Sequence, residues 1–323
     1  MSHFISANAW QKYSPKNGTY RYCLFYLFLA ICSLIYAEDS SKKASGTKPI
    51  VANKGFVKAY EDTKGVCLVL GLPKNGSTDW LIKLASKKSA LICFQSPDEK
   101  EITKVRKAAV QANVLGRGLI IMQKEWQHLV FPDNMISMAW VSSKAVVFPG
   151  IKKELLRVLH PGGKATLVGK AKTNVVEKPF PAGGEAWSHP YHGPDNNSVS
   201  KDKLALYPYR TQFLGYPMFG AISELCVASG GRMYLAFGHQ AKHAIHNEVL
   251  NKLYCINAYN GAILWTRPLK IGFMIQRNTI ISTPDKLYLA DNESCKVLDA
   301  KTGKLLDEII PPVKQAGGTV WKW

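Results

Sequence analysis

The sequence predicts a multidomain protein in which a Rossmann-like α/β domain precedes an all-β domain that forms an incomplete β-propeller. The first half alternates apolar runs of strand length with helical patterns, which is typical of a parallel sheet covered on both faces. The second half repeats a phrase of two apolar runs around a glycine turn, 42 residues apart. Hairpin repeats of about 40 to 45 residues indicate propeller blades. A chain of 323 residues is long enough for two such cores.

Residues 1–37 have the pattern of a secretory signal peptide. Basic residues precede an apolar stretch at 23–36, and Ala37 is followed by the acidic pair Glu38-Asp39. The stretch is shorter than the roughly 20 residues of a membrane span, so we expect cleavage and no other transmembrane segment. An uncleaved anchor is the alternative. The protein is then expected in the periplasm, in the cell envelope or outside the cell.

The formal net charge of +19 lies largely in lysine clusters such as Lys83/Lys87/Lys88 and Lys152-Lys153. No groove-reading helix and no motif for base stacking accompanies this charge, so we expect no specific binding of nucleic acid. We favour a solvated basic surface that attracts anionic envelope components or polysaccharide.

Five of the seven cysteines remain once the signal peptide is removed, and they form neither a Cys-x-x-Cys pair nor a haem motif. The pattern leaves one disulfide open and does not say which residues would pair. For Cys67, Cys93 and Cys255 we expect small buried side chains in strands.

The elements of the α/β domain, at 65–170, follow a Ser/Lys/Gly-rich linker at 38–64. Short apolar runs predict strands at 66–70, 90–94, 118–122, 135–141 and 164–169. Amphipathic patterns predict helices around 80–84, from Pro97 onward and at 151–159. Ser77 or Thr78 would cap the first helix, with Asp79 in its first turn. A second linker, rich in Lys, Pro and Gly, is expected at 171–184.

Three segments of this domain resemble class I S-adenosylmethionine (SAM)-dependent methyltransferases. They are the strand, loop and helix at 66–85, the phrase Phe131-Pro-Asp-Asn-Met135 before the fourth strand, and Leu156-Arg-Val-Leu-His-Pro-Gly-Gly163 before the fifth. The resemblance implies a cofactor-binding site at two places, the loop with Gly71 and Gly76 and the end of the second strand, Gln95 and Ser96.

The chain departs from the family pattern at this implied site. Val69 stands where the family has an acidic residue, and the middle glycine of the loop is replaced around Pro73-Lys74. Gln95 stands where a carboxylate would accept the ribose hydroxyls, and a neutral amide is the weaker acceptor. We therefore expect a degenerate domain that binds no SAM, with a variant SAM site as the alternative.

The β domain, at 185–323, is predicted by its repeats. The runs at 253–265 and 296–306 are two hairpins in which Gly261 matches Gly303, each turn requiring φ > 0. The strand before each hairpin also recurs, as Met-Tyr-Leu-Ala at 233–236 and Leu-Tyr-Leu-Ala at 287–290.

The opening segment at 185–198 and the phrase at 258–265 resemble bacterial propellers with pyrroloquinoline quinone (PQQ)-type repeats. In that family a glycine makes the hairpin turn and a tryptophan, here Trp265, docks against the next blade. In the second copy the tryptophan position falls at Asp307 or a neighbour. The resemblance implies roughly three blades, the first part of a propeller in a chain that ends within strand-like sequence. Signal, methyltransferase-like domain and propeller together resemble a group of large exported bacterial hybrid proteins.

Quinone dehydrogenases of that fold hold Ca²⁺ with carboxylate and amide oxygens. The candidate ligands here are Asp195, Asn196, Asn197, Asp291, Asn292 and Glu293. We favour the interpretation that both groups simply fill turns.

A histidine cluster is the candidate transition-metal site. His239, His243 and His246 are spaced by four and three residues and would share a helical face, and His189 and His192 could join them. A polar insertion that binds no metal is the interpretation we favour.

These observations predict an exported PQQ-like propeller protein that acts as a binding or scaffold module for protein or polymer partners, attached to an inactive methyltransferase-like domain. Two enzymatic alternatives remain. The preferred one is a PQQ- and Ca²⁺-dependent alcohol or sugar dehydrogenase whose active site lies in further C-terminal blades. The other is a SAM-dependent methyltransferase with a variant cofactor loop. The sequence identifies neither substrate nor partner.

Overall fold

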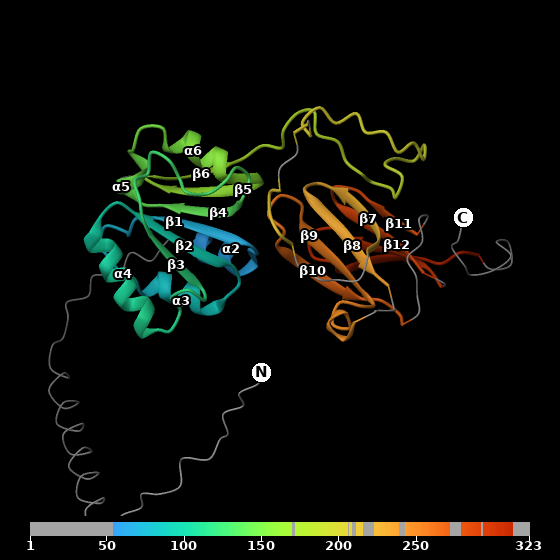
Figure 1. Cartoon of the computed structure of the whole chain (residues 1–323), viewed down its shortest axis with the longest axis horizontal. Coiled ribbons are helices and arrows are strands. Elements are labelled where there is room, and N and C mark those ends of the chain that lie inside the picture. The colour runs from blue at the N-terminus through green and yellow to red at the C-terminus, as the bar shows by residue number, and fades with distance from the viewer. Residues whose placement is uncertain are drawn as a thin grey trace, which may run out of the picture. The chain divides into compact units, whose positions relative to one another are not determined.

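The computed structural model describes residues 54–169, 172–205, 207–208, 211–215, 223–238, 243–271, 279–291 and 293–312 (Figure 1). The predicted signal peptide, most of the first linker, His239 and Asn292 lie outside these residues. In the described part, no helix has the length and the apolar character needed to cross a membrane.

A six-stranded sheet forms the centre of the α/β domain, in the order β3-β2-β1-β4-β5-β6. Its strands are β1 (Val66–Leu70), β2 (Leu91–Ser96), β3 (Leu119–Gln123), β4 (Ile136–Val141), β5 (Leu159–Val168) and β6 (Thr173–Glu177). The first five are parallel and β6 is antiparallel to β5. This order is Rossmann-like, and the prediction of a parallel sheet in the first half is confirmed.

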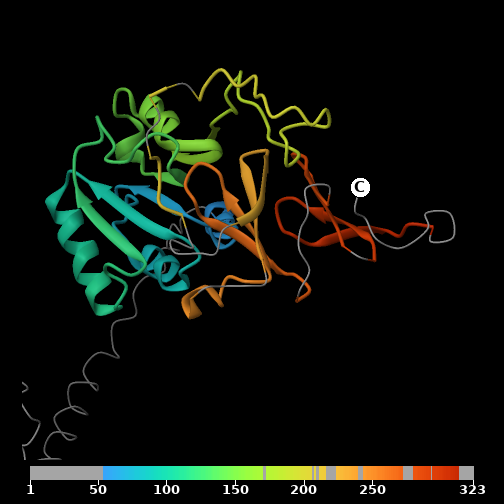
Figure 2. The same ribbon diagram turned by 45° about the vertical axis from the view of Figure 1, so that its right-hand side comes forward.

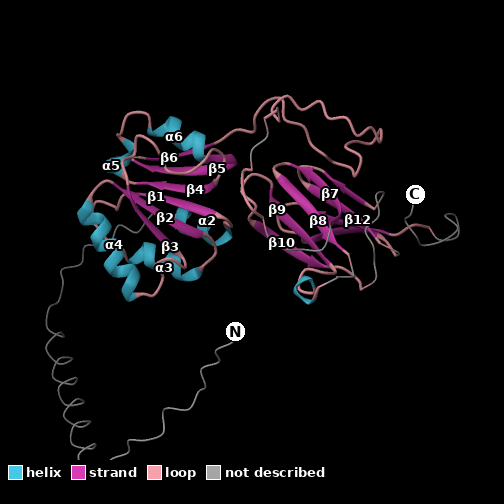
Figure 3. Ribbon diagram, in the orientation of Figure 1, coloured by secondary structure: helices cyan, strands magenta, loops and turns pink. Residues whose placement is uncertain are grey.

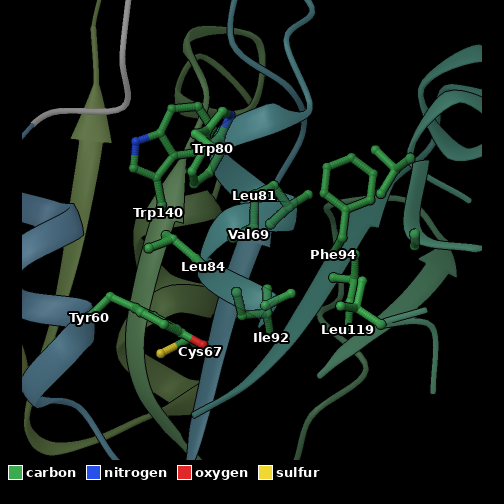
Figure 4. Close-up of a cluster of buried hydrophobic side chains, with 14 of the residues drawn as sticks. Tyr60, Cys67, Val69, Trp80, Leu81, Leu84, Ile92, Phe94, Leu119 and Trp140 are labelled. Atoms are coloured by element: carbon green, nitrogen blue, oxygen red, sulfur yellow. The ribbon is translucent and has the colours of Figure 1, made fainter. Parts of the chain in front are cut away.

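Helices cover both faces of this sheet, as Figure 3 shows. One face carries α2 (Lys54–Asp62), α3 (Asp79–Lys87) and α4 (Glu99–Gln111), and the other carries α5 (Ser143–Val146) and α6 (Ile151–Val158). On the first face Tyr60, Trp80, Leu84 and Trp140 are buried with the side chains of β1 and β2 (Figure 4). The Trp80 and Trp140 ring centroids are 5.0 Å apart.

Both predicted linkers contain regular structure, which corrects the prediction. Helix α2 lies inside 38–64, because Phe56 and Tyr60 are buried and the Tyr60 hydroxyl donates to the Ala90 carbonyl at 2.8 Å. Strand β6 lies inside 171–184 and pairs along its whole length with β5. Strand β6 is an edge strand with mostly exposed side chains, and such a strand needs no apolar pattern. Its composition therefore resembles that of a linker.

The fifth strand, predicted at 164–169, begins earlier than expected, because His160 to Gly163 also belong to β5. The pairing of β5 with β4 shifts register between Ile136 and Met138 at this point. The other predicted strands and helices of the domain lie within about two residues of the observed ones, as is usual for element ends.

Two four-stranded antiparallel sheets make up the described part of the β domain (Figure 2). The first contains β7 (Ser223–Ser229), β8 (Arg232–Phe237), β9 (Lys252–Asn257) and β10 (Ile263–Pro268). The second contains β11 (Ile280–Ser282), β12 (Lys286–Ala290), β13 (Cys295–Asp299) and β14 (Leu305–Ile309). Side chains of both sheets share one buried cluster, including Tyr234, Leu253, Ile280 and Leu289. That these sheets are propeller blades, that a third blade follows and that the blades form part of a propeller stay predictions.

The hairpin turns have the predicted geometry. Gly261 and Gly303 have φ of 72° and 70°, and the side chains of Asn257 and Asp299 accept backbone N–H bonds within each turn. Trp265 lies on Gly303 of the second sheet and donates its indole N–H to the Ala300 carbonyl at 3.2 Å. Trp265 therefore packs on the following hairpin, and that this hairpin belongs to the next blade of a propeller stays a prediction.

The five cysteines of the described part are free. Cys67 and Cys93 are on adjacent strands but belong to buried clusters on opposite faces of the sheet. Burial raises the pKa of Cys93 and of Cys255 to about 12, which leaves both thiols protonated. Cys67, Cys93 and Cys255 are small buried residues in strands, as predicted.

Candidate functional site

The candidate site is the carboxyl edge of the parallel sheet, where ligands of open α/β sheets bind. Backbone hydrogen bonds hold the chain segments after three strands together there. Gly71 N donates to the Gln95 carbonyl at 3.1 Å, and Ser142 N donates to the Leu70 carbonyl at 2.9 Å. The residues that follow β1, β2 and β4 therefore meet at one place.

The two loop glycines implied by the methyltransferase resemblance have the left-handed backbone that favours glycine. Gly71 has φ of 70° and Gly76 has φ of 64°. A Cβ on Gly71 would lie 2.6 Å from Ser142 Oγ and 3.3 Å from the Trp126 ring. The space above Gly71 is thus filled by side chains of the protein itself.

Gln95 and Ser96 lie at the end of β2, as predicted, but their side chains are enclosed. Both residues are 0 % exposed. Gln95 Nε2 donates to the Glu125 carbonyl at 2.8 Å, and Gln95 Oε1 is buried without a hydrogen-bond partner. Ser96 Oγ donates to Glu101 at 2.9 Å. Neither side chain reaches the surface of the edge.

Glu101 accepts several of the hydrogen bonds at this edge, and the sequence did not predict this role. Its carboxylate accepts from Leu72 N at 3.1 Å, from Ser96 Oγ at 2.9 Å and from Lys144 Nζ at 2.7 Å. These donors come from the segments after β1, β2 and β4. The bond to Glu101 raises the pKa of Lys144, so the ammonium group is charged at neutral pH. One signal was available, because Glu101 precedes the buried Ile102 in the first turn of α4.

Trp126 closes the edge from the segment between β3 and β4. It is 8 % exposed, and its indole N–H donates to the Gln95 carbonyl at 3.4 Å. Its ring packs edge-on against Phe148, with centroids 6.3 Å apart. An aromatic side chain therefore fills the space between the ends of β1 and β2.

Arg157 anchors the segment that carries Trp126. Its guanidinium donates to the carbonyls of Leu129 and Phe131, both at 2.8 Å, while Glu154 accepts from Leu129 N at 2.9 Å. Arg157 also pairs with Glu154 at 2.8 Å and with Asp133 at 2.9 Å. The arginine of the methyltransferase-like phrase at 156–163 thus holds the segment that covers the candidate site.

This arrangement does not fit SAM at the implied positions. A nucleoside cofactor needs open space against the glycine loop and polar atoms facing that space. Here Ser142 and Trp126 occupy the space above Gly71, Gln95 Nε2 and Ser96 Oγ bond to protein partners, and Gln95 Oε1 is enclosed without one.

The histidine cluster is described only in part. The ring centroids of His243 and His246 are 5.5 Å apart. His243 precedes a single 3-10 turn, Ala244–His246, and His246 ends it, while His239 is outside the described residues. His192 pairs with Glu185 at 3.2 Å and His189 Nδ1 lies 2.9 Å from Ser188 Oγ. Among described residues, no group of three or more His, Cys, Asp or Glu could hold a metal. The metal site at His239, His243 and His246 stays a prediction.

The carboxylates named as calcium candidates are used in turns. Asp291 accepts from the backbone of Glu293 and Ser294 and pairs with Lys296. Asp195 accepts from Asn197 N at 3.3 Å. These bonds support the turn interpretation for both residues.

Comparisons with known proteins extend only to the fold. No protein-family model matches the chain, and no curated protein matches its sequence. A candidate SAM-dependent methyltransferase of Methanococcus maripaludis is 20% identical, with a TM-score of 0.32 over 36% of this chain and 52% of its own. A SAM-dependent methyltransferase from Aquifex aeolicus is 14% identical, with a TM-score of 0.31 over 36% of this chain and 62% of its own.

Geranyl diphosphate C-methyltransferase from Streptomyces coelicolor A3(2) is 10% identical, with a TM-score of 0.30 over 35% of this chain and 43% of its own. The chain thus spans about half the length of the structures that it matches. These likenesses cover about a third of the chain, and they say nothing about its activity.

Proposed function

We propose that the protein is an exported binding or scaffold protein whose methyltransferase-like domain has a structural role and binds no SAM. The filled carboxyl edge carries this proposal. Glu101, Trp126 and Ser142 take the space and the hydrogen bonds that a ligand would need beside Gly71. The two β sheets supply the binding surface for protein or polymer partners in this proposal.

A SAM-dependent methyltransferase with a variant loop is the second candidate. The methyltransferase-like fold and the positive φ of Gly71 and Gly76 favour it. It requires Trp126 to leave the edge, because the ring lies against Gly71. It also requires a new partner for Ser96, whose hydroxyl is bonded to Glu101.

Isothermal titration of the full chain with SAM and with S-adenosylhomocysteine tests the two candidates. We expect no heat of binding for either compound, and micromolar affinity would overturn the proposal in favour of the methyltransferase. A Gly71→Val variant is the matched control, since it should abolish any binding that uses the glycine loop. Binding that survives this change would have to use a different site.

The PQQ-dependent dehydrogenase finds no support in the described residues, whose candidate calcium ligands are engaged in turns. Reconstitution of the full chain with PQQ and Ca²⁺ and a dye-linked assay with alcohols and sugars tests it. We expect no turnover.

A further inference from the structure

A groove between α3 and α4 lies on the outer side of the α/β domain. It has a volume of about 470 Å³. Its lining residues are Thr78, Asp79, Ile82, Lys83, Ala108 and Ala112, together with Gln111. Ile82, Ala108 and Ala112 supply apolar groups. The polar groups come from Thr78, Asp79, Lys83 and Gln111. The groove is thus neither a purely apolar surface nor a purely charged one.

One face of α4 carries a row of three lysines that leads to Gln111, which lines the groove, whereas Lys83 of α3 is the lysine that lines the groove itself. Lys100, Lys104, Lys107 and Gln111 are spaced by four, three and four residues, which places them on one side of the helix. The opposite side buries Ile102, Val105 and Ala109 against the sheet. Lys104 Nζ would lie 3.4 Å from a Cβ on Gly76, so the row reaches the loop before α3.

The cations outnumber the carboxylates around the groove, where Asp79 is a lining residue and the pKa of Glu61 is lowered by Lys87 and also by Lys83. Segment 74–112 contains eight Lys and Arg but four Asp and Glu. Among the described residues, Lys83, Lys100, Lys104 and Lys107 are in no ion pair. Of the four carboxylates, Glu101 is buried with Lys144, and Asp98 accepts the Lys100 backbone N–H at the start of α4. The row therefore presents uncompensated positive charge to solvent.

We propose that this groove binds an acidic polysaccharide. The C–H face of a sugar ring suits the apolar groups of Ile82 and the two alanines, and Gln111 and Thr78 can bond its hydroxyls. The carboxylates or sulfates of successive sugars pair with Lys83 and the row on α4, which from Lys100 to Lys107 extends about 10 Å along the helix. Each exposed pair contributes little, so affinity comes from several pairs made together.

Nucleic acid is the less suitable polyanion for this groove. Single strands are held by aromatic side chains that stack on the bases, and none of the groove-lining residues is aromatic. Lysines contact anions as point charges and do not read base edges as arginine does. The inference does not depend on whether the carboxyl edge binds SAM.

The test compares two double charge reversals in the full chain. Lys83→Glu with Lys104→Glu removes cations at the groove, and Lys152→Glu with Lys153→Glu makes the same change of net charge on α6, where both lysines are exposed. Affinity for polygalacturonate is measured for both variants and for the original chain. Neutral dextran and a DNA oligonucleotide of equal charge serve as other ligands.

We expect the original chain to bind polygalacturonate, to lose that binding at about 0.5 M salt and not to bind dextran. The groove variant should bind at least tenfold more weakly, and the α6 variant should stay within twofold. Gln111→Ala should weaken binding of the polysaccharide but not of DNA. Equal losses in the two double variants, tighter binding of DNA than of polygalacturonate, or no binding at all would overturn the inference.

Discussion

Gly71 in the α/β domain and Gly303 in the second β sheet both lie under an indole ring. The ring has a different role at each position. Both glycines have φ of 70°, and each ring comes from another part of the chain. A Cβ would come 3.3 Å from Trp126 at Gly71 and 2.7 Å from Trp265 at Gly303. The ring of Trp265 joins one hairpin to the next sheet, whereas Trp126 fills the edge where a ligand would bind.

A glycine beneath an aromatic ring therefore indicates close packing and not a particular function. In the β sheets the arrangement recurs, since Phe213 lies on Gly261 as Trp265 lies on Gly303. At Gly71 the arrangement is combined with the buried carboxylate of Glu101.

Replacing Trp126 should have the largest effect on stability. Trp126→Ala removes a nearly buried ring and leaves a cavity, so the free energy of unfolding should fall by about 3 to 4 kcal/mol. Urea denaturation of the full chain followed by circular dichroism measures this loss. Trp126→Phe keeps most of the packing and should cost about half as much. Equal stability of Trp126→Ala and the original chain would show that the ring does not close the edge.

Replacing Trp265 should have a smaller effect, because its ring is only half-buried. Trp265→Ala loses the contact with Gly303, the contact with Tyr234 and the hydrogen bond to Ala300, and should cost about 2 to 3 kcal/mol. Trp265→Phe separates the hydrogen bond from the packing. Hydrogen exchange should show faster exchange in β11 to β14 and unchanged exchange in β1 to β5. Faster exchange confined to the α/β domain would contradict the assigned role.

The sequence predicted Trp265 but not Trp126, for a physical reason. The role of Trp265 follows from a repeat in which the turn, the glycine and the aromatic residue keep a fixed spacing, so local geometry determines the contact. Trp126 and Glu101 reach Gly71 from segments 55 and 30 residues away along the chain. Only the tertiary fold brings them there, and no local pattern marks them.

The helices and strands also divide into those that the sequence predicts and those that it does not. Strands β1, β2 and β4 were predictable because burial on both faces requires continuous apolar runs. Strand β6 and helix α2 were missed. The first is an edge strand with exposed side chains, and the second buries only Phe56 and Tyr60 within an otherwise polar stretch.

A methyl group added to Gly71 should destabilise the fold more than one added to a glycine with free space around it. Gly71→Ala meets Ser142 and Trp126 in addition to the unfavourable φ, whereas Gly150 has φ of 81° and no atom within 4 Å of its Cβ position. Gly150→Ala should cost about 1 kcal/mol from the backbone alone, and Gly71→Ala about 1 kcal/mol more. Thermal or urea unfolding of the two variants measures this difference. Equal costs would mean that the space above Gly71 is open.

The smallest effect on stability should come from lowering the pH, because Glu154 is the carboxylate that anchors the segment carrying Trp126. Bonds from Arg157 and from Leu129 N lower the pKa of Glu154 in the folded protein. Its stabilising contribution is therefore complete above the unfolded pKa of about 4.3 and is lost as pH falls through the lower folded value. Glu154→Gln should lose this contribution at neutral pH and flatten the decline of stability below about pH 4.5. Since Trp126 is held by this segment, its fluorescence should report the loosening, and a decline as steep in Glu154→Gln as in the original chain would place the acid-sensitive group elsewhere.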